Sequence, residues 1–130
     1  MTIKRVLCPE RLRQIPSQFS WVDHRLVRDH YLERCDTSAA ALYLFLITVA
    51  DEHGLSYYSD AALVRGLSMA PACLSQARAD LIRIGLIAYQ RPLYQVLALD
   101  SPRRVEAHEL GADKISIRIG QLRAALRRAP

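Results

Sequence analysis

The middle of the chain consists of apolar blocks separated by short polar stretches, and several of these blocks predict helices. The clearest block, residues 38–50 (SAAALYLFLITVA), is apolar on nearly every side. It follows Asp36-Thr37-Ser38, which can cap a helix N-terminus, and precedes Gly54, which we expect at the position just after the helix. A helix that is apolar all round is buried on all sides, so this block predicts the central helix of the domain.

A second group of patterns follows the central block. Residues 55–59 (LSYYS) are short and aromatic, which is typical of a strand. Ser59 and Asp60 can cap a short helix that continues to Leu67. We therefore predict a strand and then a second helix.

The next block predicts a third helix and a hairpin. After a turn at residues 68–70, Pro71 suits the first position of a helix that continues to about Ile84 and ends at Gly85. Residues 86–99 (LIAYQRPLYQVLAL) are rich in β-forming side chains, and Gln90-Arg91-Pro92 divides them into two halves. We expect a β-hairpin with that tripeptide at its tip.

Two flanks lie outside this central part. Residues 1–36 predict an N-terminal arm with one short helix between Asp23 and Arg34, and Phe19 and Trp21 are expected to pin the arm to the domain. Residues 101–130 predict a linker and a basic C-terminal helix over residues 114–128. The alternation of isoleucines in this segment also allows a strand, but the length of the segment favours the helix. In a helix, one apolar stripe would contain Ile115, Ile119, Leu122 and Leu126.

Residues 63–87 (LVRGLSMAPACLSQARADLIRIGLI) resemble the winged helix-turn-helix superfamily of bacterial DNA-binding proteins. The shared features are apolar spacing in the second helix, a tight turn, a third helix and a Gly-Leu-Ile exit into the wing. Residues 41–59 (ALYLFLITVADEHGLSYYS) are also similar to the first helix of winged domains in replication-initiator and phage-replisome proteins. The resemblance covers residues 37–99 and departs from the usual pattern at Ala70, where a capping serine is common, and at Arg78, where an aliphatic residue is usual.

The resemblance implies a mainly α domain with a small β-hairpin wing, which we place at residues 37–100 between the arm and the C-terminal segment. Its function would be sequence-dependent binding of duplex DNA, in transcription regulation or as an accessory to replication or transposition of a mobile element. Such domains also serve as protein-binding modules, so the fold alone does not decide the function.

The third helix presents two different faces when positions advance by about 100° per residue. The face expected to point inward contains Leu74, Ala77, Leu81 and Ile84, and the opposite face contains Ala72, Gln76, Ala79 and Arg83. Gln76 can bind adenine in a bidentate manner, and Ser75 and Arg83 can reach phosphates or bases. Asp80 lies toward the same face and would repel phosphates, whereas Arg78 is expected to extend to solvent or to pair with a nearby carboxylate.

The formal net charge of the 130-residue chain is +5. Seven basic and four acidic residues give +3 over residues 1–35, four and six give −2 over residues 36–100, and seven and three give +4 over residues 101–130. Because phosphate neutralisation provides most of the non-specific affinity for DNA, the flanks and the wing are expected to contribute it. The candidate DNA-binding residues are Ser75, Gln76, Arg78, Arg83, Tyr89, Gln90, Arg91, Lys4, Arg5, Arg11, Arg13, Arg118, Arg123 and Arg127.

A different interpretation is a protein–protein adaptor. It would use the winged helix and the C-terminal helix to bind a partner, and DNA binding would be incidental. The net −2 of residues 36–100 and the apolar stripe near the C-terminus favour it. A homodimer or larger assembly is compatible with either function.

Other classes of function find little support. The sequence has no glycine-rich phosphate loop, nucleophile elbow or paired catalytic carboxylates, and Asp23, His24 and His30 are better explained as capping and surface residues than as an acid/base group. Three separate cysteines fit reduced thiols in the cytoplasm, and no metal or cofactor is expected. The longest apolar run is shorter than the roughly 20 residues that span a bilayer, and no secretory signal is indicated, so we expect no membrane association.

Overall fold

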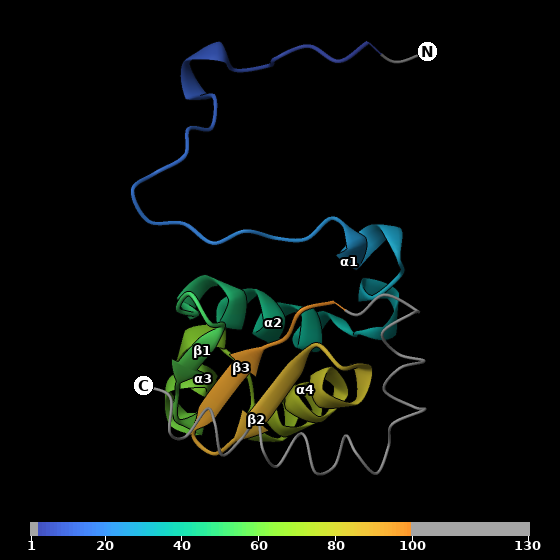
Figure 1. Cartoon of the computed structure of the whole chain (residues 1–130), viewed down its shortest axis with the longest axis vertical. Coiled ribbons are helices and arrows are strands. Elements are labelled where there is room, and N and C mark those ends of the chain that lie inside the picture. Colours follow the sequence, from blue (N-terminus) through green and yellow to red (C-terminus); the bar gives the residue numbers. More distant parts are fainter. Residues whose placement is uncertain (1–2, 100–130) are drawn as a thin grey trace. The chain divides into compact units, whose positions relative to one another are not determined.

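The computed structural model describes residues 3–99, which form a mixed α/β structure (Figure 1). Within this range lie four α-helices: α1 (Arg25–Arg28), α2 (Thr37–Val49), α3 (Asp60–Leu67) and α4 (Pro71–Ile84). Three strands, β1 (Leu55–Tyr57), β2 (Ile87–Gln90) and β3 (Leu93–Val96), form an antiparallel sheet in the order β1-β3-β2. The helix expected over residues 114–128 lies outside the described residues.

Helix α2 packs against α3, α4 and β3, as expected of a central helix, but it is not buried on all sides, because Leu44 is 60% exposed. Its N-terminus is capped by Asp36, whose Oδ1 accepts a hydrogen bond from the Ala39 backbone N–H at 2.8 Å. Ala39, Leu42, Tyr43 and Leu46 are buried, and α2 packs most extensively on α4. Burial of the Tyr43 ring raises the pKa of its phenol to about 12, so the group stays neutral in the core.

The end of α2 differs from the prediction. The helix stops at Val49 because Ala50 is extended, and Gly54 is not the residue after the helix but part of the turn into β1. Gly54 has a φ of +82°, and a Cβ there would lie 2.6 Å from the Val96 carbonyl oxygen. A glycine is therefore required by the close approach of this turn to the strand β3.

Local signals define α3 and α4 as predicted. The Ser59 Oγ accepts a hydrogen bond from the Ala62 backbone N–H and so caps α3. Helix α4 has Pro71 at its first position, has no side-chain cap at Ala70, and ends at Gly85, whose φ is +87°. The left-handed conformation at Gly85 ends the helix and directs the chain into β2.

The predicted hairpin is present and belongs to the three-stranded sheet. In register, Gln90 pairs with Leu93 and Tyr89 pairs with Tyr94, so two residues, Arg91 and Pro92, connect the strands. The connection is one residue shorter than the predicted tripeptide tip. Strand β1 pairs with the other edge of β3, which fixes the hairpin against the rest of the domain.

The N-terminal arm is not pinned as predicted. Phe19 and Trp21 are 63% and 75% exposed, so they do not fill a groove on the domain. The prediction that these two side chains anchor the arm was wrong, because an aromatic residue in the sequence does not reveal whether an apolar surface exists to receive it. The predicted helix between Asp23 and Arg34 is divided into α1 and a 3-10 turn (Leu32–Arg34) by His30, whose φ is +64°.

Ser56 carries a buried hydroxyl that has no hydrogen-bond partner among residues 3–99. It lies in β1, opposite Tyr94 of β3. Because an unpaired buried hydroxyl keeps its desolvation cost, Ser56→Ala is expected to raise the free energy of unfolding by about 1 kcal/mol, as measured by urea denaturation. The matched control Ser59→Ala removes a helix cap and should lower it by about 1 kcal/mol. A loss of stability in both variants would contradict the prediction.

None of the helices in residues 3–99 combines the length and the apolar character that crossing a bilayer requires.

Candidate nucleic-acid interface

One face of α4 is exposed along its length, as its spacing predicts. Leu74, Ala77 and Leu81 are buried against the core, while the opposite positions are exposed: Ala72, Ser75, Gln76, Ala79 and Arg83. The first two turns of this face carry only small or uncharged side chains. Such a face can approach another surface closely at Ala72 and Ser75, whose side chains are small, and Gln76 is the longer side chain on it.

The acidic residue on α4 is engaged by the two side chains beside it. The Gln76 Nε2 donates a hydrogen bond to the Asp80 Oδ1 at 3.1 Å, and the Arg83 Nη2 lies 3.3 Å from the same oxygen. The Asp80 side chain is only 16% exposed, whereas that of Arg83 is 65% exposed. Asp80 is therefore a largely covered, paired carboxylate and not a free negative charge on the outward face.

Arg78 is held in a cluster that joins four elements. Its Nη1 donates to the Asp60 Oδ1 of α3 and to the Tyr94 hydroxyl of β3, both at 2.8 Å. Its guanidinium also lies over the Tyr89 ring of β2, 4.5 Å from the ring centre. The pairing with a carboxylate that the sequence predicts for Arg78 is thus present, with Asp60 as the partner.

The electrostatics of this cluster follow from its partial burial. Burial lowers the pKa of Arg78, but the hydrogen bonds that Arg78 donates to Asp60 and Tyr94 act in the opposite direction. The net shift of the pKa is upward, so the guanidinium remains charged. Burial raises the pKa of the Tyr94 phenol, although Arg78 opposes this shift. The cluster attaches the hairpin to α3 and α4 and leaves Arg78 13% exposed.

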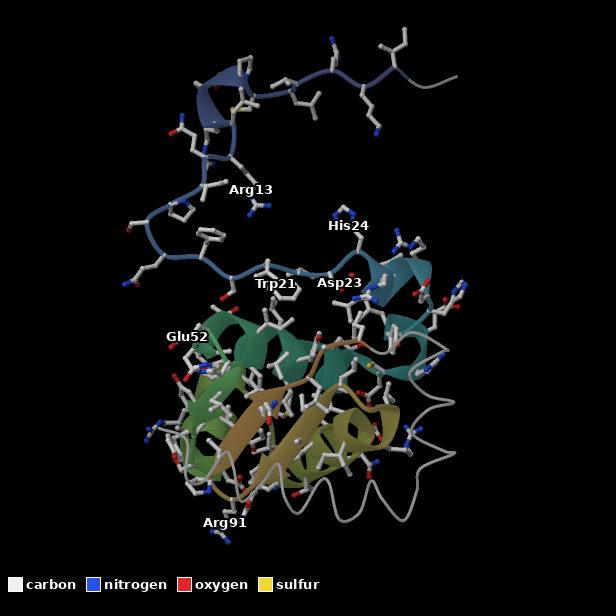
Figure 2. All side chains as sticks on the ribbon, in the orientation of Figure 1. Arg13, Trp21, Asp23, His24, Glu52 and Arg91 are labelled. Carbon is white, nitrogen blue, oxygen red and sulfur yellow. The ribbon has the colours of Figure 1, made fainter. Side chains whose placement is uncertain are left out.

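The hairpin places two of its three predicted contact residues at its tip. Gln90 and Arg91 are exposed there, and Figure 2 shows Arg91 projecting away from the sheet. Tyr89 lies further into β2, where its ring is stacked against Tyr94 with 4.5 Å between ring centres. Tyr89 therefore has a packing role that the sequence pattern did not predict.

The remaining predicted cations divide between the arm and the C-terminal segment. Lys4, Arg5, Arg11 and Arg13 are all exposed on the arm; Arg13 is labelled in Figure 2. Arg118, Arg123 and Arg127 lie outside the described residues. The structure adds Arg65, an exposed arginine in the last turn of α3 that pairs with no carboxylate within residues 3–99. Its position just before the turn into α4 is the signal that could have identified it.

Asp23 acts as a local structural residue. Its Oδ1 accepts a hydrogen bond from the Arg25 backbone N–H at 2.9 Å, and its Oδ2 lies 2.7 Å from the Arg25 Nη2. The hydrogen bonds from the Arg25 side chain, and then from its backbone, lower the pKa of Asp23 to about 2. His30 contacts Glu33. The hydrogen bonds that hold Asp23 come from Arg25 and not from His24 or His30. The geometry is that of a capped helix start.

The thiols show no ligand geometry. Cys8 is exposed, and Cys35 and Cys73 are half-buried and unbridged. Burial, and then the nearby Asp80 and Asp36 carboxylates, raise the pKa of Cys35, so this thiol stays protonated. Within the described range, no three histidine, cysteine, aspartate or glutamate side chains converge as ligands for a metal ion.

No protein-family model, no curated protein and no solved structure matches this chain. By its own geometry, the candidate site is the exposed face of α4. Among residues 37–97, two exposed arginines, Arg65 and Arg91, have no carboxylate partner.

Proposed function

We propose that residues 37–99 are a winged-helix domain that binds duplex DNA, with α4 in the major groove and the β2–β3 hairpin beside it. The observation that carries the proposal is the exposed face of α4. Its first two turns carry only uncharged side chains, and the one carboxylate of the helix, Asp80, is paired. The order of elements α2-β1-α3-α4-β2-β3 supports it, because it matches the order of helix, strand, two helices and hairpin expected of a winged helix.

The side chains on this face have the chemistry for base and phosphate contacts. The amide of Gln76 matches the donor and acceptor of adenine, and Ser75 and Arg83 can reach phosphates or base edges. Ala72 and Ala79 are exposed and small, so they allow close approach and contact with thymine methyl groups. Arg65 and Arg91, which are exposed on α3 and on the hairpin tip, would supply further contacts to the phosphate backbone.

The charges of the flanks complete the proposal. Lys4, Arg5, Arg11 and Arg13 on the exposed arm, together with the basic C-terminal segment, would provide the counterion release that the near-neutral domain lacks. We propose that the protein acts in the cytoplasm, as a dimer or larger assembly, in transcription regulation or as an accessory to replication or transposition.

Binding-site selection with a randomised duplex library, followed by titrations at several salt concentrations, tests this function. Gln76→Ala is expected to reduce the preference for the selected duplex over a scrambled one by about 10-fold, since a bidentate base contact contributes about 1–3 kcal/mol. If Arg83 neutralises one phosphate, Arg83→Ala should make the slope of log K against log salt shallower by about 0.9. Arg28→Ala, which removes an exposed arginine of α1, is the control and should leave the preference unchanged. Absence of salt-sensitive binding to any duplex at low ionic strength would contradict the proposal.

A second candidate function, a protein–protein adaptor, is favoured by the arm. Within the described residues, the arm exposes large apolar side chains that have no surface to cover them: Ile3, Val6, Leu7, Leu12, Ile15, Phe19, Trp21 and Val22. Apolar side chains gathered in one exposed segment are typical of a partner-binding region. The C-terminal helix that is also expected to bind a partner lies outside the described residues.

A further inference from the structure

The exposed face of α4 contains one carboxylate whose contacts determine how two other side chains are presented. A single oxygen, the Asp80 Oδ1, accepts from the Gln76 Nε2 at 3.1 Å and from the Arg83 Nη2 at 3.3 Å. We propose that Asp80 is a positioning residue that gives α4 its preference for adenine, an inference that rests on the proposed DNA binding. It acts through Gln76 and Arg83, since its own side chain is largely covered.

The first step concerns the orientation of the Gln76 amide. A glutamine amide has one acceptor oxygen and two N–H donors, and its two ends can exchange by a flip of the side chain. A carboxylate accepts hydrogen bonds and does not donate them, so Asp80 binds the NH₂ end and repels the oxygen end. Asp80 therefore fixes which end of the amide points along the helix and which atoms remain free.

The second step concerns the base that the fixed amide matches. With one N–H bonded to Asp80, Gln76 keeps one N–H donor and its Oε1 acceptor. Adenine presents one acceptor, N7, and one donor, the N6 amine, in the major groove, whereas guanine presents two acceptors. The remaining groups of Gln76 satisfy adenine and leave one guanine acceptor facing the glutamine oxygen. The ligand class is therefore duplex DNA with an adenine opposite the second turn of α4.

The third step concerns charge. Arg83 is 65% exposed, so it can contact a phosphate while one of its N–H groups stays on Asp80. Asp80 also lies close enough to Cys35 to help raise the pKa of that thiol, after the larger effect of burial. The groups shown near Asp80 are thus Gln76, Arg83 and Cys35. The negative charge of Asp80 opposes indiscriminate phosphate binding.

The test compares two duplexes that differ only in the base pair selected opposite Gln76, A·T in one and G·C in the other. The variants are Asp80→Ala, which removes the acceptor, and Asp80→Asn, which removes the charge but keeps an oxygen able to accept from Gln76. The control is Glu52→Ala, which removes an equal charge from an exposed turn at a distance from α4 in the chain; Glu52 is labelled in Figure 2. Circular dichroism checks that each variant is folded.

The wild type is expected to prefer the A·T duplex by about 10-fold, within the range of one bidentate base contact. Asp80→Ala should reduce this preference to about twofold and increase affinity for the G·C duplex by about threefold. Asp80→Asn should retain more of the preference than Asp80→Ala, and Glu52→Ala should retain it in full. A loss of preference that is specific to position 80 distinguishes positioning from a general charge effect.

Three results would overturn the inference. If Asp80→Ala changes affinity for both duplexes by the same factor, Asp80 acts only through its charge. If the wild type binds the two duplexes equally, Gln76 is not positioned to read adenine, although DNA binding itself stands. If the wild type binds no duplex at low ionic strength, the proposed function fails, and this outcome is distinct from the other two.

Discussion

Arg78→Met is expected to lower the free energy of unfolding by about 3 kcal/mol, although it exchanges one long side chain for another on a helix surface. Methionine keeps much of the packing volume but removes the charge and the hydrogen bonds to Asp60 and Tyr94. The Tyr94 hydroxyl, on a residue with no exposed surface, then loses its donor, which costs about 1–3 kcal/mol. The contact over the Tyr89 ring adds about 0.5–2 kcal/mol.

The Asp60 carboxylate limits the size of this effect. Its side chain is half-exposed, so water can solvate it once Arg78 is gone, and the loss stays below that of a fully buried ion pair. The measurement is urea denaturation of the wild type and of the Arg78→Met, Tyr94→Phe and double variants. Because both residues share one hydrogen bond, the double variant should be less destabilised than the sum of the single variants.

Arg83→Met is the matched control for Arg78→Met. It is the same substitution on the same helix, but Arg83 is mostly exposed, and its hydrogen bond within residues 3–99 is the one to Asp80. A surface substitution of this kind is expected to change stability by no more than about 0.5 kcal/mol. Equal destabilisation in the two variants would show that the cluster of Arg78, Asp60, Tyr94 and Tyr89 does not hold the hairpin.

Replacing Lys4, Arg5, Arg11 and Arg13 together with alanine is expected to have the largest effect on DNA affinity. If each cation neutralises one phosphate, the slope of log K against log salt becomes shallower by about 3.6. Between 50 and 200 mM salt, the wild type should then lose about 100-fold more affinity than the variant. Fluorescence anisotropy with a labelled duplex at four or more salt concentrations measures both slopes. An unchanged slope would show that the arm does not contact the phosphate backbone.

A second arm variant separates the two candidate functions. Replacing Val6, Leu7, Leu12 and Ile15 with serine removes exposed apolar surface and keeps every charge of the arm. If the arm serves DNA binding, this variant should have the wild-type salt slope. If the arm serves an adaptor, the serine variant should lose a protein partner that the alanine variant keeps, because burial of apolar surface, and not charge, would hold that partner.

Much of the fold between residues 37 and 97 could be predicted from local patterns. The cap at Asp36, the cap at Ser59, Pro71 at the start of α4 and Gly85 at its end each act over a few residues, so the sequence contains the whole of the relevant interaction. The division of α4 into a buried and an exposed face follows from the same local geometry. The predicted exposure of Gln76 and Arg83 was confirmed for this reason.

The predictions that were wrong concern contacts between distant parts of the chain. Gly54 is required by the carbonyl of Val96, which belongs to a different strand, and no pattern near Gly54 reveals that neighbour. Phe19 and Trp21 were expected to be anchors because aromatic side chains are usually buried, but anchoring needs a receiving surface that only the packed domain can provide.

By itself, the sequence determined where α2 begins, where α3 and α4 begin and end, and which face of α4 points outward. Only the tertiary structure decided that Asp60, 18 residues away in the chain, pairs with Arg78, and that Tyr89 and Tyr94 enclose the same guanidinium. It also showed that Asp80 is covered and shared between Gln76 and Arg83. Helix boundaries depend on neighbours a few residues apart, whereas the partner of a charged side chain depends on which surfaces the core brings together.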